Sequence, residues 1–488
     1  MKRHACRLAA LVPLVWVVAG LAQAPLKGLP YDQASQTAAP AADVTFTKHI
    51  APILQRSCQQ CHRPDGGAPM SLTTYEEVRP WARSIKTRTG LGPRAGVMPP
   101  WFVERNIGIQ HFKQDPSLSE PEIAMVAKWV DSGAPRGNPA DMPTAKDFGT
   151  GDNWTLGVPD LVLRSAAVVV PAQGPDKWGA LGLVPTGLTE DRYVASVEVR
   201  EVNDIPTDGS VKTVGGRYAF HHMTYSSIAQ GEGVSMAEAE AEGTSWPIHE
   251  VGRNPDIFPI EAGRLLQKNS ALALTAYHLH SNGRETRAHL EFGFKFFPRG
   301  YKPQYRRSSL RLGNGIDIDV KPDRSSQELH SYAVLQEHTK IVAFEPHLHA
   351  PGVRMCLEAI WGHNILTLNC VGYDHNWVKQ YVYEDDAAPV LPKGTIVHLI
   401  GFLDTTMANK NPVDSRNWAG GGRRSIANMF IDLGYSVQLT EEQFQAEMAK
   451  RRAKMKTRND YDVGCPLCWA PLVQPAPPTP TRAPGGQR

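Results

Sequence analysis

Residues 272–280 read Leu-Ala-Leu-Thr-Ala-Tyr-His-Leu-His, a β-prone run that ends in two histidines and is followed by the turn residues Ser-Asn-Gly. Comparable short runs, separated by turn residues, recur over about 154–445; they are 161–163, 194–199, 289–296, 396–402 and 429–437. Many short strands between turns are typical of β-sandwiches. Because the region is long for one sandwich, we predict two all-β sandwiches, at 154–307 and 308–440.

The preceding region, 43–140, predicts a small all-α domain. Residues 45–57 carry apolar side chains on one helical face. Further on, Ser119 and Glu122 form a capping box before an apolar stripe that stops at Gly133. Helices followed by sandwiches make the chain a multidomain protein.

Composition excludes several classes of protein. Of 488 residues, 41% are hydrophobic, which is enough for real cores and rules out global disorder. Lys+Arg 52 against Asp+Glu 49 leave a net charge of +3, so we expect no nucleic-acid partner. Seven cysteines are too few for a disulfide scaffold.

The two ends of the chain read as segments outside the folded domains. Residues 1–24 have a basic start, an apolar run and an Ala-Gln-Ala cleavage signal, which predicts a signal peptide and a periplasmic or secreted protein. No later stretch is long enough to span a membrane. Residues 25–42 read as a linker, and 441–488 as a charged helix followed by a Pro-rich tail.

A C-x-x-C-H motif lies in the helical region. Cys58 and Cys61 have the spacing that forms thioethers to one covalent haem c, and His62 follows as the proximal iron ligand. The alternative is a redox or disulfide pair with an incidental histidine. With its flanking helices, the segment resembles a small class I cytochrome c domain.

The sixth iron ligand is expected to be a methionine on a loop. Met98 is favoured, because the prolines that follow it restrict the loop geometry. Met70 and His111 remain the alternatives. His/Met ligation raises the iron potential and suits the transfer of single electrons.

Histidine and methionine clusters recur along the β region. On a strand, residues i and i+2 share a face, so His347 and His349 can reach one ion, whereas the adjacent His221 and His222 need a bulge or a strand end. Imidazole suits copper, and a thioether favours its reduced state. Any one cluster could also be a chance pairing of histidines without a metal, since the chain has 17 histidines. The set comprises His221, His222, Met223, His278, His280, His347, His349 and Met429.

The order His-His-Met, His, His-x-His, Met over 154–440 resembles the copper type II ascorbate-dependent monooxygenases, the peptidylglycine α-hydroxylating and dopamine β-monooxygenase family. The resemblance implies two consecutive jelly-roll-like sandwiches with one copper each. His221, His222 and His280 are expected to hold the first copper, with His278 as the fallback for His280. A catalytic set would hold the second copper; it comprises His347, His349 and Met429.

With a cytochrome domain in front, the chain resembles bacterial fusions of cytochrome c with a copper monooxygenase-like region. The resemblance implies hydroxylation of a C–H bond of a small organic substrate with O2. Electrons would come through haem c, or from an ascorbate-like or protein donor. The alternatives are a non-catalytic electron-transfer cytochrome with a copper-binding module, and sandwiches whose His clusters are vestigial.

Three positions depart from the peptide-amidating members of that family. Where those place groups that hold a substrate carboxylate, this chain has Glu345, Ile431 and Leu433. A cationic clamp is therefore replaced by a carboxylate, which disfavours a C-terminal glycine peptide as substrate.

The remaining cysteines predict local pairings. Cys356 and Cys370 lie symmetrically about a Gly-His-Asn turn, which predicts a cross-strand disulfide. Cys465 and Cys468 form a second C-x-x-C without a following histidine, and read as a local disulfide, a redox pair or half a metal site.

Overall fold

The fold is described from a computed structural model. It covers residues 44–64, 66–148, 154–206, 210–211, 214–230, 235–310, 312–315, 318–412, 414–422 and 427–455. These residues belong to one compact unit, Val44–Arg488. The expected signal peptide, the linker and the Pro-rich tail with Cys465 and Cys468 lie outside the described residues.

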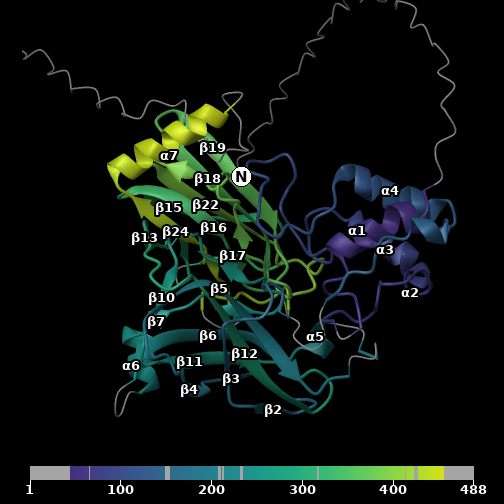
Figure 1. The fold of residues 1–488 in the computed structure, drawn as a ribbon, viewed down its shortest axis with the longest axis horizontal. Helices are drawn as coiled ribbons and strands as arrows, with labels where there is room; N and C mark the ends of the chain where they lie inside the picture. The colour runs from purple at the N-terminus through teal and green to yellow at the C-terminus, as the bar shows by residue number, and fades with distance from the viewer. Residues whose placement is uncertain are drawn as a thin grey trace, which may run out of the picture. The chain divides into compact units, whose positions relative to one another are not determined.

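Helices gather at the start of the described chain and beside the sheets (Figure 1). The capping box of Ser119 and Glu122 is present at the start of α4, as predicted. The expected helix at 45–57 forms as a π-helical turn followed by α1, with Pro52 in the first turn of α1, where its missing N–H costs little. The helical segments are η1 (Phe46–Ile50), α1 (Ala51–Ser57), α2 (Tyr75–Val78), η2 (Arg79–Trp81), α3 (Ala82–Thr89), α4 (Glu120–Asp131), η3 (Pro139–Asp141), α5 (Val214–Arg217), α6 (Met236–Glu242) and α7 (Glu441–Lys454).

The first sandwich has two six-stranded sheets. One contains β1 (Leu161–Arg164), β2 (Val168–Val170), β5 (Arg192–Asn203), β9 (Asp256–Ile257), β10 (Arg264–Leu266) and β12 (Thr286–Phe296). The other contains β3 (Lys177–Gly179), β4 (Gly182–Pro185), β6 (Phe220–Ala229), β7 (Thr244–Ser245), β8 (His249–Glu250) and β11 (Ser270–Leu279). Leucines and phenylalanines that alternate along β11 and β12 fill the core between the two sheets.

The second group of strands forms three sheets. They contain β13 (Arg306–Ser308), β16 (His338–Phe344), β20 (Tyr381–Val382), β21 (Val390–Leu391) and β24 (Tyr435–Leu439); β14 (Gly313–Asn314), β17 (Pro346–Leu348) and β23 (Phe430–Asp432); and β15 (Gln327–Val334), β18 (Gly352–Trp361), β19 (Asn364–Gly372) and β22 (Ile396–Leu403). The expected strand over 429–437 is divided at Gly434, where a Cβ would meet the backbone of Ala343.

All-β architecture downstream of the helices is thus confirmed. One apolar core runs from the first sandwich onto the β16–β24 sheet and α7, through residues such as Val342 and Phe444. A second core lies inside the second sandwich. Sheet membership changes between β12, which ends at Phe296, and β13, which begins at Arg306.

Part of the region expected to be helical packs against the second sandwich. The backbone N–H of Glu104 donates to Cys370 at 2.9 Å, and that of Ile109 donates to Leu368 at 2.8 Å. Trp101 and Phe112 are buried in the same core as these strands. Burial of these apolar side chains holds the segment against the second sandwich, although it belongs in sequence to the helical region.

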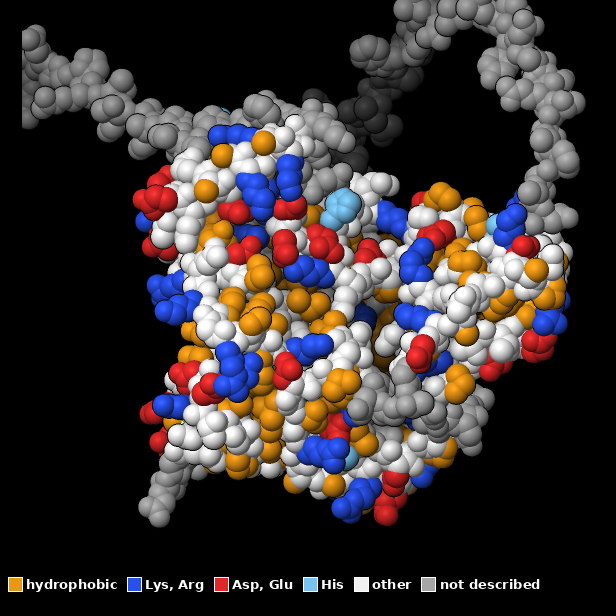
Figure 2. Space-filling model, viewed as in Figure 1, with side chains coloured by type: hydrophobic (Ala, Val, Ile, Leu, Met, Phe, Trp, Pro, Cys, Tyr) orange, Lys and Arg blue, Asp and Glu red, His pale blue; other side chains and the backbone are white. Residues whose placement is uncertain are grey.

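On the face drawn in Figure 2, basic and acidic side chains are interspersed and form no large field of one sign. This agrees with the nearly balanced composition. Among the described residues, no helix combines the length and the apolar content needed to cross a bilayer.

Candidate metal centre

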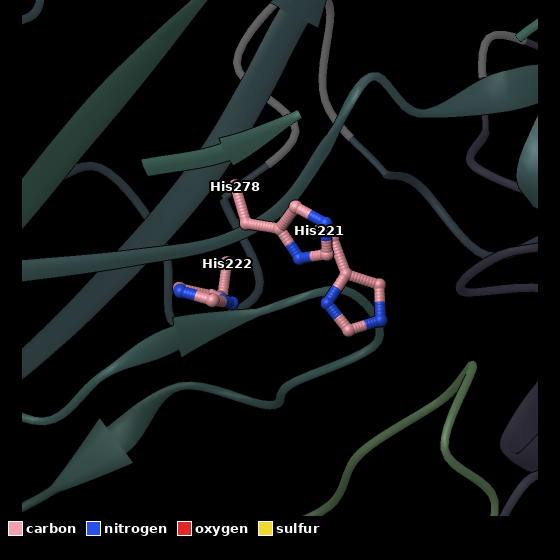
Figure 3. A group of neighbouring side chains, drawn as sticks. All are labelled: His221, His222 and His278. Atoms are coloured by element: carbon pink, nitrogen blue, oxygen red, sulfur yellow. The ribbon is translucent and has the colours of Figure 1, made fainter. Parts of the chain in front are cut away.

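Three histidines of the first sandwich form a group with the spacing of metal ligands. One ring nitrogen from each of His221, His222 and His278 lies within 4.8 Å of the other two. The rings come from β6 and β11, which are neighbours in one sheet (Figure 3). His221 and His278 are buried.

A register shift lets two adjacent histidines reach the same place. His278 pairs with His222, but the next pair joins Leu279 to Phe220, so His221 is the extra residue on β6. Such an irregularity turns a side chain that would face the opposite side of the sheet. This irregularity is the bulge that the sequence predicts as necessary for His221 and His222 to share an ion.

Asp176 was not anticipated from the sequence, and it holds both histidines at the end of β11. Its Oδ2 accepts from His278 Nε2 at 2.9 Å, and its Oδ1 accepts from His280 Nδ1 at 2.8 Å. Asp176, His278 and His280 also form a second potential ligand group. His278, the predicted alternative to His280, therefore has the ligand spacing to His221 and His222. This spacing favours His278 over the preferred candidate His280. His280 still lies close, with its ring centroid 4.8 Å from that of His221.

The second expected set lies where β17 meets β23. The rings of His347 and His349 have centroids 5.3 Å apart. Leu348 pairs with Phe430 across the two strands, so continuing this register by one pair puts Met429 opposite His349. His349 Nδ1 lies 2.9 Å from the Ala427 carbonyl, which ties the histidine to the segment that carries Met429.

The outer nitrogens of these rings are engaged in the way that metal-bound histidines usually are. His280 Nδ1 faces a carboxylate, His349 Nδ1 faces a carbonyl, and His347 Nδ1 lies 3.0 Å from Glu250 Oε1. A carboxylate or carbonyl on one ring nitrogen fixes the tautomer and leaves a lone pair on the other. Nε2 of His280 and His349 is therefore the nitrogen available to a metal, while Nδ1 of His347 lies near Glu250 without hydrogen-bond geometry.

Burial keeps the rings of His221, His222 and His349 neutral, as metal ligation requires. It lowers the pKa of His221 to about 2, of His222 to about 4 and of His349 to about 3. Among the described residues, the buried Nδ1 of His221 has no hydrogen-bond partner. A neutral buried imidazole with an unpartnered nitrogen fits a metal ion, since an unsatisfied polar atom is otherwise costly.

Two further residues join the two sets. Glu250 lies on β8, pairs with His222 across the sheet, and reaches His347 of the second sandwich. Burial alone would raise the pKa of this carboxyl, but His347 and the other nearby groups hold it below its ordinary value. His375 follows β19, and its ring lies 5.1 Å from that of His221 and 6.2 Å from that of His349. No motif marked either residue, because both reach the site only through tertiary packing.

The C-x-x-C-H segment lies at the end of α1. Neither Cys58 nor Cys61 is in a disulfide, so both thiols are available for thioethers. His62 is buried, and its Nδ1 lies 3.1 Å from the Met70 carbonyl. Met98 is 37% exposed and lines a small cleft together with residues that include Trp101 and Ile123. His111 is exposed, with its carbonyl accepting from the Glu384 N–H.

The carboxylate at the expected substrate-clamp position has a structural partner. Glu345 is 1% exposed and forms a two-point ion pair with Arg253, one contact being 2.7 Å. Gln380 donates to it at 3.0 Å. Its charge is therefore neutralised inside the protein rather than directed at a substrate.

Comparisons with known proteins add no family. Neither protein-family models nor curated proteins give a match to this chain. The case for function therefore rests on the geometry of the site.

Proposed function

We propose that this protein is an exported oxidoreductase that carries haem c and two coppers and hydroxylates a C–H bond of a small organic substrate with O2. The reaction takes a C–H bond, O2, two electrons and two protons, and yields a C–OH group and water. Bound copper would supply O2 chemistry and single-electron transfer, and haem would supply electrons. The cytochrome c character of 43–140 and the jelly-roll character of the sandwiches are parts of this proposal.

The observation that carries the proposal is the arrangement of imidazoles around two neighbouring sites. The His349 ring is buried with its Nδ1 at the Ala427 carbonyl, and His280 Nδ1 lies at the Asp176 carboxylate, so each ring has its second nitrogen left for a metal. Such hydrogen bonds, which fix one nitrogen of each ring, are typical of metal-binding histidines rather than of a chance group. Imidazole with a thioether is also the donor set that suits copper in both oxidation states.

The residues of the chain have separate roles. His221, His222 and His278 or His280 would hold the copper of the first sandwich. His347, His349 and Met429 would hold the copper at which O2 and substrate meet. Asp176 and Glu250 orient rings and fix their tautomers, which raises the basicity of the ligands.

For haem, the support is the hydrogen bond of His62. The Met70 carbonyl lies at Nδ1, which leaves Nε2 for iron and puts the Met70 backbone on the other side of the ring. This favours a distal ligand from elsewhere, and Met98 remains our candidate.

The haem attachment segment borders residues that lead to the histidine cluster. A Cβ on Gly67 would lie 2.5 Å from the Tyr218 hydroxyl, so this tyrosine packs directly on the segment. Tyr218 precedes His221 by three residues, and its ring lies 6.4 Å from that of Trp377. This proximity supports electron supply from haem to the first copper, with an ascorbate-like or protein donor as the source.

The decisive experiment is metal analysis followed by product analysis on full-length protein purified from periplasm. We expect two coppers and one covalent haem per chain. With a reductant and 18O2, product from a panel of small substrates should carry one labelled oxygen. Iron without copper would leave only an electron carrier; copper and electron flow without labelled product would leave a relay.

Variants of the copper ligands and of the haem-binding cysteines test the proposed roles separately. His347→Ala should abolish hydroxylation and lower the copper content, while His363→Ala, an exposed turn histidine, should change neither. Cys58→Ser with Cys61→Ser should abolish covalent haem in a pyridine haemochrome assay. If reduced haem passes no electron to copper(II) in anaerobic stopped flow, haem is not the donor.

A further inference from the structure

His375 belongs to no predicted ligand set, yet it occupies the space between the two sets. Its ring lies between the histidines of the first sandwich and those of the second. Successive ring centroids lie 5.1 Å apart for His221 and His375, 6.2 Å for His375 and His349, and 5.3 Å for His349 and His347.

The spacing of His221 and His375 is that of two rings that share a metal, whereas the 6.2 Å between His375 and His349 is longer. With a nitrogen–metal distance of about 2.0 Å, two imidazoles on one ion have centroids roughly 4.5–6 Å apart, depending on the angle at the metal. His221 and His375 fall within that range, as do His221 and His278 at 5.1 Å.

The loop that carries His375 is bonded to the first sandwich although it follows a strand of the second. The Val378 N–H donates to the Val251 carbonyl at 3.2 Å, and Lys379 Nζ donates to the Gly252 carbonyl at 2.7 Å. A Cβ on Gly252 would overlap the Trp377 ring, so only glycine lets this ring pack there. The loop is thus held against the segment that follows Glu250.

The ring of His375 has an unused nitrogen inside the cluster. His375 is 9% exposed, and its Nδ1 has no hydrogen-bond partner among the described residues. The Nδ1 of His221 is equally unpartnered, and the two rings lie 5.1 Å apart, so one metal ion could satisfy a nitrogen of each.

We propose that His375 is a metal ligand that the second sandwich contributes to the copper centre of the first. The two centres then share one continuous imidazole network, in which Glu250 and His375 each cross from one sandwich to the other. This inference rests on the proposed copper binding, and it extends the ligand set beyond the one that the sequence implied.

The test is copper binding by His375→Ala in the full chain, with His363→Ala as the matched loss of one imidazole outside the cluster. Copper affinity is measured by competition with a chromophoric chelator, and nitrogen ligation by the hyperfine pattern of copper(II) EPR. We expect the variant to bind one of its two coppers more than tenfold more weakly, with a changed EPR spectrum for that site. His375→Gln separates ligation from packing, since it keeps volume and polarity but does not replace an imidazole nitrogen.

The outcomes separate this inference from the proposed function. Wild-type protein that binds two coppers, with His375→Ala indistinguishable from it in affinity and spectrum, overturns the role of His375 and leaves copper binding intact. Wild-type protein that binds no copper overturns both. If His375→Gln restores the wild-type affinity and EPR spectrum, the residue fills space and is not a ligand. Thermal unfolding of the copper-free variants checks that each is folded.

Discussion

At the scale of single residues, the candidate site depends on carboxylates as much as on histidines. Asp176 accepts from two rings, and these two contacts hold its pKa below the ordinary value although burial opposes this. Such outer partners decide which nitrogen faces the metal. A histidine motif therefore predicts that the metal ligand is an imidazole nitrogen. The carboxylate hydrogen-bonded to the ring decides which of the two nitrogens faces the metal.

Replacing Asp176 by Asn should weaken copper binding at the first site by about 10–100-fold, because the amide accepts through only one of its two polar atoms. Competition with a copper chelator measures this change. Asp319→Asn, at an exposed ion pair with Lys321, is the control and should bind copper as the wild type does. Equal affinities for Asp176→Asn and wild type would count against the outer-partner role.

Asp432 predicts a pH dependence of folding. Burial raises the pKa of Asp432 to about 7, above the value of about 3.9 for an unfolded chain. The folded state thus holds this proton more tightly. The stability it provides is complete below about pH 4 and is lost as the pH rises toward 7. Asp432→Asn keeps an oxygen for the Glu345 and Gly434 N–H groups, so it should be more stable than wild type at pH 8, with the difference vanishing near pH 4.

Urea unfolding of the copper-free proteins between pH 4 and pH 8 checks this prediction. A constant difference between Asp432→Asn and wild type over that range would show that the Asp432 carboxyl does not titrate between the two states.

At the scale of elements, the β18–β19 hairpin is the clearest match between pattern and structure. Cys356 and Cys370 pair directly across the strands and form the predicted disulfide. Gly362 in the turn has φ 58°, a backbone conformation that glycine adopts readily. The Glu104 and Ile109 N–H groups bond to the outer strand, so the hairpin also anchors the segment leading from the helical region.

Removal of this disulfide should destabilise the protein by about 3 kcal/mol, the entropy effect expected for closing a loop of about 15 residues. The variant is Cys356→Ala with Cys370→Ala, and denaturant unfolding is the measurement. Dithiothreitol should lower the stability of the wild type toward that of the variant and leave the variant unchanged. A variant as stable as oxidised wild type would contradict the expectation.

At the scale of the whole molecule, buried polar contacts hold the two sandwiches together beside the site. Arg253, which follows β8, pairs with Asp256 of its own sandwich and with Glu345 of the other. Both side chains of the Arg253–Glu345 pair are nearly inaccessible. Arg253 lies three residues from Glu250 and Glu345 lies two from His347, so this ion pair joins the two sandwiches beside both histidine sets.

Replacing Arg253 by Met should cost about 3–5 kcal/mol, because it leaves the buried carboxylates of Glu345 and Asp256 without their shared cation. Adding Glu345→Gln should recover part of the loss by removing one of these two charges. Arg164→Met should change stability by less than about 1 kcal/mol, because the Arg164 side chain is 71% exposed and the buried Glu291 keeps Arg200 as a partner. Chemical unfolding is measured for the wild type, Arg253→Met, Glu345→Gln, the double variant and Arg164→Met. Additive effects of the two single substitutions in the double variant would mean that the two residues are not coupled.

Local patterns predicted much of this protein because strand periodicity, helix caps and cysteine spacing act over few residues. They indicated the β-rich region, the capping box at Ser119, the disulfide and the histidines at strand ends. The need for a bulge at His221 also follows from local geometry, since neighbours on a strand face opposite ways.

Other features depend on contacts between segments far apart in the chain. His278 rather than His280 has the ligand spacing to His221 and His222 because a register shift, which no residue type announces, sets which rings converge. Asp176, Glu250 and His375 enter the site from a loop before β3, a two-residue strand and a loop after β19. Residue chemistry thus decides which donors the chain offers, and the packing of one sandwich against the other decides which of them meet, because burial and long-range hydrogen bonds exist only in the assembled fold.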